Sequence, residues 1–202
     1  MNTTNQPNII EHSRKSLNWT VQDVKWMPNT ATFSAVGSYA RGTGTLQLFR
    51  LSFNDQDNKT SLDKWLEIPE QKHAIKCSTF DHNTSMTDSA QLTLATGDVN
   101  GQLALYDVSR ADCPKILNIE RAHASIINQV DGAGIHGRGS PEIISASRDG
   151  TVKIWDTRQG DKPVVSLEPE THLNGNSGEN GENGGSSSQQ QQARDCWACC
   201  LG

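Results

Sequence analysis

The chain has 202 residues, and its 18 Lys and Arg stand against 23 Asp and Glu, which gives a formal net charge of −5. This mild acidity argues against nucleic acid as a partner, because phosphate binding requires a basic surface. The apolar runs are too short for a membrane helix, and residues 1–6 lack the apolar core of a secretion signal. We therefore expect a cytoplasmic protein without nucleic acid, membrane or small-molecule substrate as a partner.

The first strands are expected at residues 21–26 and 44–49. Residues 44–49 read Gly-Thr-Leu-Gln-Leu-Phe, and strict alternation of this kind predicts a strand with one buried face. Residues 51–68 carry the spaced acids Asp55, Asp57 and Asp63 among polar residues. A calcium loop would need a glycine at its sixth position and a closing glutamate, which are missing. We expect a solvated loop between two structural units here.

The same ending, Gly followed by alternating aliphatic residues and an aromatic one, returns twice, at residues 101–106 and 150–155. Each copy follows a hairpin signal, Asn100-Gly101 or Asp149-Gly150, in which both turn positions favour a positive φ. Further short strands are expected at residues 75–80, 92–96, 126–131, 142–146 and 164–167. About four short strands per unit, repeated at intervals of roughly 50 residues, predict an all-β protein built from β-propeller blades.

Residues 132–137 form a GxGxxG pattern after an expected strand. A dinucleotide site requires a helix to begin at this glycine-rich turn. The following Arg138-Gly139-Ser140-Pro141 opposes a helix, so we expect a hairpin and no bound cofactor.

Residues 174–192 contain only Asn, Gly, Ser, Glu and Gln, so we expect a disordered low-complexity insert over 171–193. The five cysteines are Cys77, Cys113, Cys196, Cys199 and Cys200. An odd, scattered set indicates reduced thiols. Cys196 and Cys199 form a CxxC, but a zinc site needs four ligands and no second pair lies nearby, so we expect no metal.

Residues 147–156 read Ser-Arg-Asp-Gly-Thr-Val-Lys-Ile-Trp-Asp and closely resemble the end of a WD repeat, with Ala122-His123 where Gly-His usually opens it. The first two repeats depart from this pattern, because they end in Phe49-Arg50 and Tyr106-Asp107. Over residues 7–197, except the insert, the chain also resembles a family of WD-repeat proteins that assemble axonemal dynein. The segments that carry this resemblance include 24–26, 40–44, 75–77, 94–98, 141–143 and 194–197.

This resemblance implies a WD-repeat β-propeller with about three blades of an expected seven, and thus an incomplete ring. The blades are expected at residues 16–68, 69–120 and 121–170, after an N-terminal segment at 1–15. Residues 194–202 would begin a fourth blade and break off, which would make the chain the N-terminal portion of a longer protein. Uncovered faces on the terminal blades would then favour association of the chain.

By the same resemblance, His123, Ser145, Asp149 and Trp155 form the structural tetrad of a WD repeat. The physical reason is that a buried imidazole needs hydrogen-bond partners. His, Ser and Asp are also the residue types of a hydrolase triad, but no GxSxG nucleophile elbow occurs, so we expect no catalytic residue. The second repeat offers Thr96 and Asn100 without a well-placed histidine.

The resemblance further implies a non-catalytic scaffold: a cytoplasmic co-chaperone adaptor that acts with an R2TP-type, prefoldin-like chaperone complex and axonemal dynein chains, with a further link to apoptosis. The candidate partner contacts are Arg148, Val99 and Arg41, all expected in exposed hairpins. One alternative is a reader of methylated histone tails, in which Trp19, Trp26 and Trp65 form an aromatic cage rather than pack between blades. The other is an enzyme that uses one of the sites discounted above.

Overall fold

The computed structural model describes residues 11, 13–54, 59–80, 92–132, 142–169 and 195–200. These residues form three antiparallel sheets, each made of four strands in chain order. The first sheet contains β1 (Thr20–Trp26), β2 (Thr32–Ser38), β3 (Gly44–Asn54) and β4 (Lys59–Glu67). The second contains β5 (Ile75–Phe80), β6 (Thr93–Asp98), β7 (Leu103–Asp107) and β8 (Lys115–Ile119). The third contains β9 (Ile127–Gly132), β10 (Glu142–Ser147), β11 (Val152–Asp156) and β12 (Val165–Leu167).

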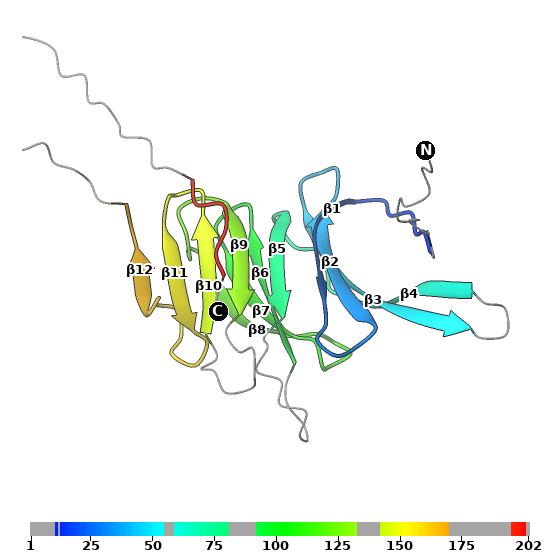
Figure 1. Ribbon diagram of the computed structural model, residues 1–202. Helices are drawn as coiled ribbons and strands as arrows, with labels where there is room; N and C mark the ends of the chain where they lie inside the picture. The colour runs from blue at the N-terminus through cyan, green and yellow to red at the C-terminus, as the bar shows by residue number, and fades with distance from the viewer. Residues whose placement is uncertain are drawn as a thin grey trace, which may run out of the picture.

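The three sheets follow one another as the blades of a propeller and form an arc rather than a closed ring (Figure 1). The first strands of neighbouring blades lie next to one another: β5 of the second blade contacts β1 of the first and β9 of the third. The expected all-β propeller fold is therefore confirmed. No helix among the described residues is long and apolar enough to cross a membrane.

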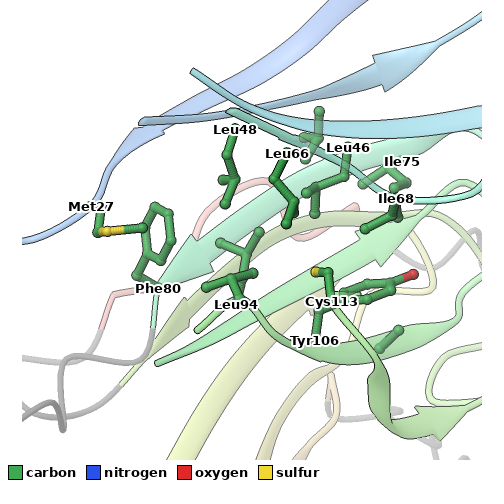
Figure 2. Packing of buried hydrophobic residues seen from close by; sticks show 13 residues of the cluster. Met27, Leu46, Leu48, Leu66, Ile68, Ile75, Phe80, Leu94, Tyr106 and Cys113 are labelled. Atoms are coloured by element: carbon green, nitrogen blue, oxygen red, sulfur yellow. The ribbon is translucent and has the colours of Figure 1, made fainter. Parts of the chain in front are cut away.

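Apolar side chains between neighbouring blades hold the arc together. Between the first two blades, Leu46 and Leu48 of β3 pack with Phe80 and Leu94 of the second blade, and all four are almost completely buried (Figure 2). A second cluster joins the next two blades, where Leu103 of β7 belongs to the same core as Ile127 and Trp155. Burial of such side chains contributes roughly 1.5–3 kcal/mol each, so these interfaces are the main apolar contribution to stability.

The expectation of a solvated loop over residues 51–68 is wrong. The third strand continues to Asn54, and β4 occupies Lys59–Glu67, with Leu51 opposite Leu62 and Leu48 opposite Leu66. The register shifts between Leu48 and Phe49, which interrupts the alternation and leaves Trp65 largely exposed. A β-bulge of this kind places two residues against one, so the polar and apolar residues of β4 do not alternate as in a regular strand.

Several expectations fall on residues outside the described part of the chain: the insert at 171–193, Asp55 and Asp57, and all of the GxGxxG segment beyond Gly132. Residues 195–200, expected to begin a fourth blade, run without regular strand structure beside the third blade (Figure 1). The Cys196 amide donates to the Ser147 carbonyl at 3.0 Å, and the Asn128 side chain donates to the Cys196 carbonyl at 2.8 Å.

A glycine in the β6–β7 turn allows close contact between blades. Gly101 has a φ of 82°, and a Cβ atom there would lie 2.3 Å from the His123 carbonyl oxygen. Gly42 has a similar φ of 86°, but a Cβ atom there would meet nothing within 4 Å. An alanine would therefore adopt an unfavourable positive φ at both positions, but it would also clash with the neighbouring main chain at position 101.

We expect Gly42→Ala to lower the free energy of unfolding by about 1 kcal/mol, the cost of a non-glycine residue in the left-handed region. Gly101→Ala should lower it by about a further 1–3 kcal/mol, because the main chain around His123 must shift. Urea denaturation monitored by tryptophan fluorescence measures both. Equal losses in the two variants would contradict the close contact.

Candidate functional site

Four side chains of the third blade form a continuous chain of hydrogen bonds. The Trp155 indole of β11 donates to the Ser145 hydroxyl of β10 at 2.9 Å. Ser145 Oγ lies 2.7 Å from Nε2 of His123, which precedes β9. His123 Nδ1 lies 3.1 Å from Oδ2 of Asp149, in the turn between β10 and β11. The structure thus brings together the four residues of the expected tetrad.

The donors and acceptors assign the protons in this chain. The Asp149 carboxylate only accepts, so His123 Nδ1–H donates to it. A neutral imidazole then accepts at Nε2 from the Ser145 hydroxyl, whose oxygen accepts from the Trp155 indole. Burial lowers the pKa of His123 below its usual value, although the nearby Asp149 charge acts in the opposite direction. The imidazole is therefore held neutral at physiological pH.

Thr151 is a member of this network that the sequence analysis did not identify. Its hydroxyl lies 2.7 Å from Asp149 Oδ1, and its amide donates to the same oxygen at 2.9 Å. Burial alone would raise the pKa of Asp149, but these bonds, with one from the Ala124 amide, outweigh it and lower the pKa to about 2. The position of Thr151 directly after Asp149-Gly150 is the signal that could have indicated it, since such turns direct hydroxyls and amides toward the aspartate.

The order Asp149–His123–Ser145 is that of a catalytic triad, but a substrate could not reach the Ser145 hydroxyl. Ser145 has no exposed surface, and its oxygen is enclosed between the indole of Trp155 and the imidazole of His123. A nucleophile must reach its substrate, and this hydroxyl has no path to one. The hydrogen-bonded chain therefore supports a structural role for the four residues.

In the described part of the second blade, Thr96 and Tyr106 interact through a side-chain hydrogen bond, but no histidine completes an equivalent network. Thr96 donates to the Ala104 carbonyl, and Asn100 lies in the exposed part of the β6–β7 turn. Asp98 instead accepts from the amides of Asn100 and Gln102, both at 2.8 Å. Tyr106 takes the place of the tryptophan, and burial raises the pKa of its hydroxyl.

The three tryptophans considered for an aromatic cage have different surroundings. Trp19 is buried in a small apolar cluster with Ala35 and Phe49. Trp26 is exposed and meets Phe33 edge to face, and Trp65 has the Arg50 guanidinium over its ring at 5.0 Å. Two of the three are thus exposed rather than packed between blades, and the ring of Trp65 already has a cation over it.

The five cysteines form no disulfide, and the described residues contain no group of three or more His, Cys, Asp or Glu that could hold a metal ion. Burial raises the pKa of Cys199 to about 12 and that of Cys113 to about 11. Raised values oppose formation of the reactive thiolate at neutral pH.

A groove of about 440 Å³ crosses one face of all three blades, and we call it the three-blade groove. Its lining comes from β1 (Gln22), the second blade (Lys76, Val99), the third blade (Ile126, Asn128, Arg148) and the segment after the insert (Asp195, Trp197). It therefore brings together Val99 and Arg148, two of the expected partner contacts. Arg41, the third, lies elsewhere and is paired with Glu70 at 2.6 Å.

The chemistry of this groove suits a protein partner. Val99 and Trp197 are exposed apolar side chains, and Arg148 lies 3.7 Å from Asp195 in an exposed ion pair. Exposed aromatic and arginine side chains with apolar neighbours are the usual anchors of protein interfaces. The sequence alone did not indicate the contribution of Trp197, because a long insert separates it from the third blade.

We expect His123→Ala and Asp149→Ala each to lower the free energy of unfolding by about 1–3 kcal/mol, because each leaves buried polar partners unsatisfied. Asp112→Ala is the matched control: it removes an exposed ion pair with Arg110 and should cost less than about 1 kcal/mol. Losses from the tetrad variants no larger than the control's would contradict a structural tetrad.

The lowered pKa of His123 predicts a pH dependence of stability. Below about pH 6.5 the unfolded imidazole binds a proton that the folded one still rejects, so acidification favours unfolding. Asp149 keeps its contribution until the pH approaches its usual value, well below this range. Between pH 7.5 and 5.5, the stability difference between the native chain and His123→Asn should therefore shrink. A difference that grows in this range would show that the fold favours the imidazolium.

Comparisons with known proteins agree with this architecture. Residues 114–156 match the WD40 family model described as WD domain, G-beta repeat. One chain of the solved Mitotic Checkpoint Complex superposes with a TM-score of 0.52 at 18% identity, over 77% of this chain and 39% of that chain. The solved WD40 repeats of RRP9 superpose with a TM-score of 0.51 at 12% identity, over 77% of this chain and 40% of that chain. Such distant likeness shows the fold alone.

Closer similarity extends over the whole chain. It is 36% identical over 204 residues to Dynein axonemal assembly factor 10 of Chlamydomonas reinhardtii, and 39% identical over the same length to the Bos taurus protein of that name. Each alignment covers 100% of this chain and 48% of the relative. The chain therefore spans about half the length of the curated relatives it matches. The chain has the fold of a WD-repeat β-propeller, and its similarity along its length is to proteins named Dynein axonemal assembly factor 10.

Proposed function

We propose that this chain acts as a non-catalytic WD-repeat scaffold in the assembly of axonemal dynein. The observation that carries the proposal is its similarity, from end to end, to proteins named Dynein axonemal assembly factor 10 in organisms as distant as an alga and a mammal. Because the chain spans about half of those proteins, the proposal concerns the share of their activity that these blades carry.

The finer form of the proposal is a cytoplasmic co-chaperone adaptor of the type called Monad, or WD repeat-containing protein 92. Such an adaptor would connect an R2TP-type, prefoldin-like chaperone complex with axonemal dynein chains, and the same resemblance extends the proposal to apoptosis. The three-blade groove supports an adaptor role, since it joins side chains from all three blades on a scaffold with a packed core. Loops held on such a scaffold are suited to binding.

The alternatives have less support. A histone reader would need its tryptophans around one methylated lysine, whereas Trp19 is in a buried cluster and Trp65 faces Arg50. An enzyme would need access to Ser145, which is fully buried. A protein scaffold requires neither feature.

The proposal is tested by affinity purification of the tagged chain from ciliated cells, followed by mass spectrometry. We expect axonemal dynein chains and chaperone subunits to be enriched over a tag-only control. Arg148→Glu should reduce their recovery by about tenfold, because a reversed charge in a groove opposes the partner that the original charge attracts.

Arg110→Glu is the matched control, because Arg110 is also an exposed turn arginine paired with a nearby aspartate, outside the groove. It should leave recovery unchanged. Enrichment of histones in place of dynein chains would favour the reader, and recovery of neither class would contradict the scaffold. Equal losses in both arginine variants would remove the groove from the proposal.

A further inference from the structure

A second hollow lies away from the three-blade groove and shares no lining residue with it. It has a volume of about 680 Å³ and opens among segments of different blades. Lys72 comes from the link between β4 and β5, Gln102 from the β6–β7 turn, Arg121 from the link between β8 and β9, and Lys153 from β11. Because Lys72, Arg121 and Lys153 are basic, we call it the cationic hollow.

Its lining is positive on a chain that is negative overall. Lys72, Arg121 and Lys153 supply three basic side chains, and Glu120 is the one carboxylate in the lining. The whole chain, by contrast, has a net charge of −5. Like charges gathered from three separate segments repel one another, and the one carboxylate of Glu120 can offset only one of the three.

Two of these cations have no partner within the described part of the chain. Lys72 and Arg121 are exposed, and no hydrogen bond or ion pair joins either of them to another described residue. Lys153 donates to the Ala122 carbonyl at 2.7 Å, which fixes its ammonium group at the hollow and leaves further N–H donors available. The hollow therefore presents donors with unused capacity for an anionic acceptor.

Hydrogen bonds to three different segments hold the wall that carries Arg121. The His123 amide donates to the Gly101 carbonyl at 3.0 Å, and the Ala124 amide donates to Asp149 at 2.9 Å. The bond from Lys153 to Ala122 adds a third anchor. Binding to a wall that is already ordered avoids most of the entropy cost of fixing a loop.

A smaller hollow of about 220 Å³ continues the site, because it also includes Lys72, Gln102 and Glu120 in its lining. It adds Asp98, whose carboxylate already accepts from two backbone amides, together with Tyr106 and Lys115, whose ammonium group lies 5.5 Å from the Tyr106 ring centroid. An extended ligand could thus place one group among the cations of the larger hollow and the next against Tyr106. Room for successive side chains is a feature of peptide sites.

We propose that the cationic hollow binds an acidic peptide segment of a partner protein, with its carboxylates paired to Lys72, Arg121 and Lys153. Carboxylates suit these donors, and arginine can pair with one through two parallel hydrogen bonds. A long polyanion such as nucleic acid would also meet the net negative charge of the remaining surface, whereas a short acidic segment meets mainly the local charge. This proposal goes beyond the scaffold role, since it concerns another surface and a stated partner chemistry.

Fluorescence anisotropy of the full chain with labelled hexaglutamate tests the proposal, with labelled hexaglutamine as the neutral probe. We expect saturable binding of hexaglutamate that weakens as salt increases, and none of hexaglutamine. Arg121→Gln and Lys72→Gln should each raise the Kd by about fivefold, the effect of losing one partly screened charge pair. Lys162→Gln removes an exposed cation outside the lining and should leave the Kd unchanged.

Arg148→Glu, which alters the three-blade groove, should also leave hexaglutamate binding unchanged, so failure here and failure of the scaffold proposal are distinguishable. Circular dichroism of each variant establishes that it is folded. Equal weakening by Lys162→Gln would show attraction to net charge alone and would overturn the site. A single-stranded oligonucleotide that binds as tightly as hexaglutamate, with the same loss in Arg121→Gln, would overturn the acidic peptide in favour of a general polyanion site.

Discussion

The packing of one four-stranded sheet against the next is the constraint on which the rest of this structure depends. Leu94 of the second blade is buried because β3 of the first blade covers it, and Ile127 of the third blade approaches so closely that only glycine fits at position 97. The first blade has a small core of its own around Trp19 and Phe49, but the two larger clusters each join two blades. Both the three-blade groove and the cationic hollow are lined by several blades, so each exists only while this packing holds.

The tetrad illustrates that an Asp–His–Ser chain of hydrogen bonds is not by itself a catalytic site. His123 accepts from Ser145 and donates to Asp149, as in a hydrolase, yet its neutral imidazole serves to connect strands β10 and β11 to the link before β9. The Trp155 indole, which donates to the serine oxygen, makes the difference, together with the full burial of Ser145. Asp149 also accepts from the Ala124 amide, so a network that stabilises the fold helps to order the wall that carries Arg121.

The sequence predicted those elements whose signal is local. Alternating residues ahead of Phe49, Tyr106 and Trp155 located strands in all three blades, and the motif around Asp149 indicated its partners in the tetrad. The fourth strand of the first blade was missed because its alternation is broken by the bulge opposite Leu48 and Phe49. Polar residues such as Asp63 therefore suggested a loop, although they lie in a strand whose backbone pairs with β3.

Sites assembled from distant segments had no such local signal. Lys72, Arg121 and Lys153 lie on separate segments of the sequence, and each alone resembles any solvated surface cation. Only the stacking of blades brings them to one hollow. The same holds for Trp197, which reaches the groove through contacts of its neighbours with Asn128 and Ser147. Average composition indicated an acidic chain and argued against nucleic acid as a partner, yet recognition depends on local charge. A net charge of −5 therefore excludes long polyanions more readily than it excludes a short acidic peptide.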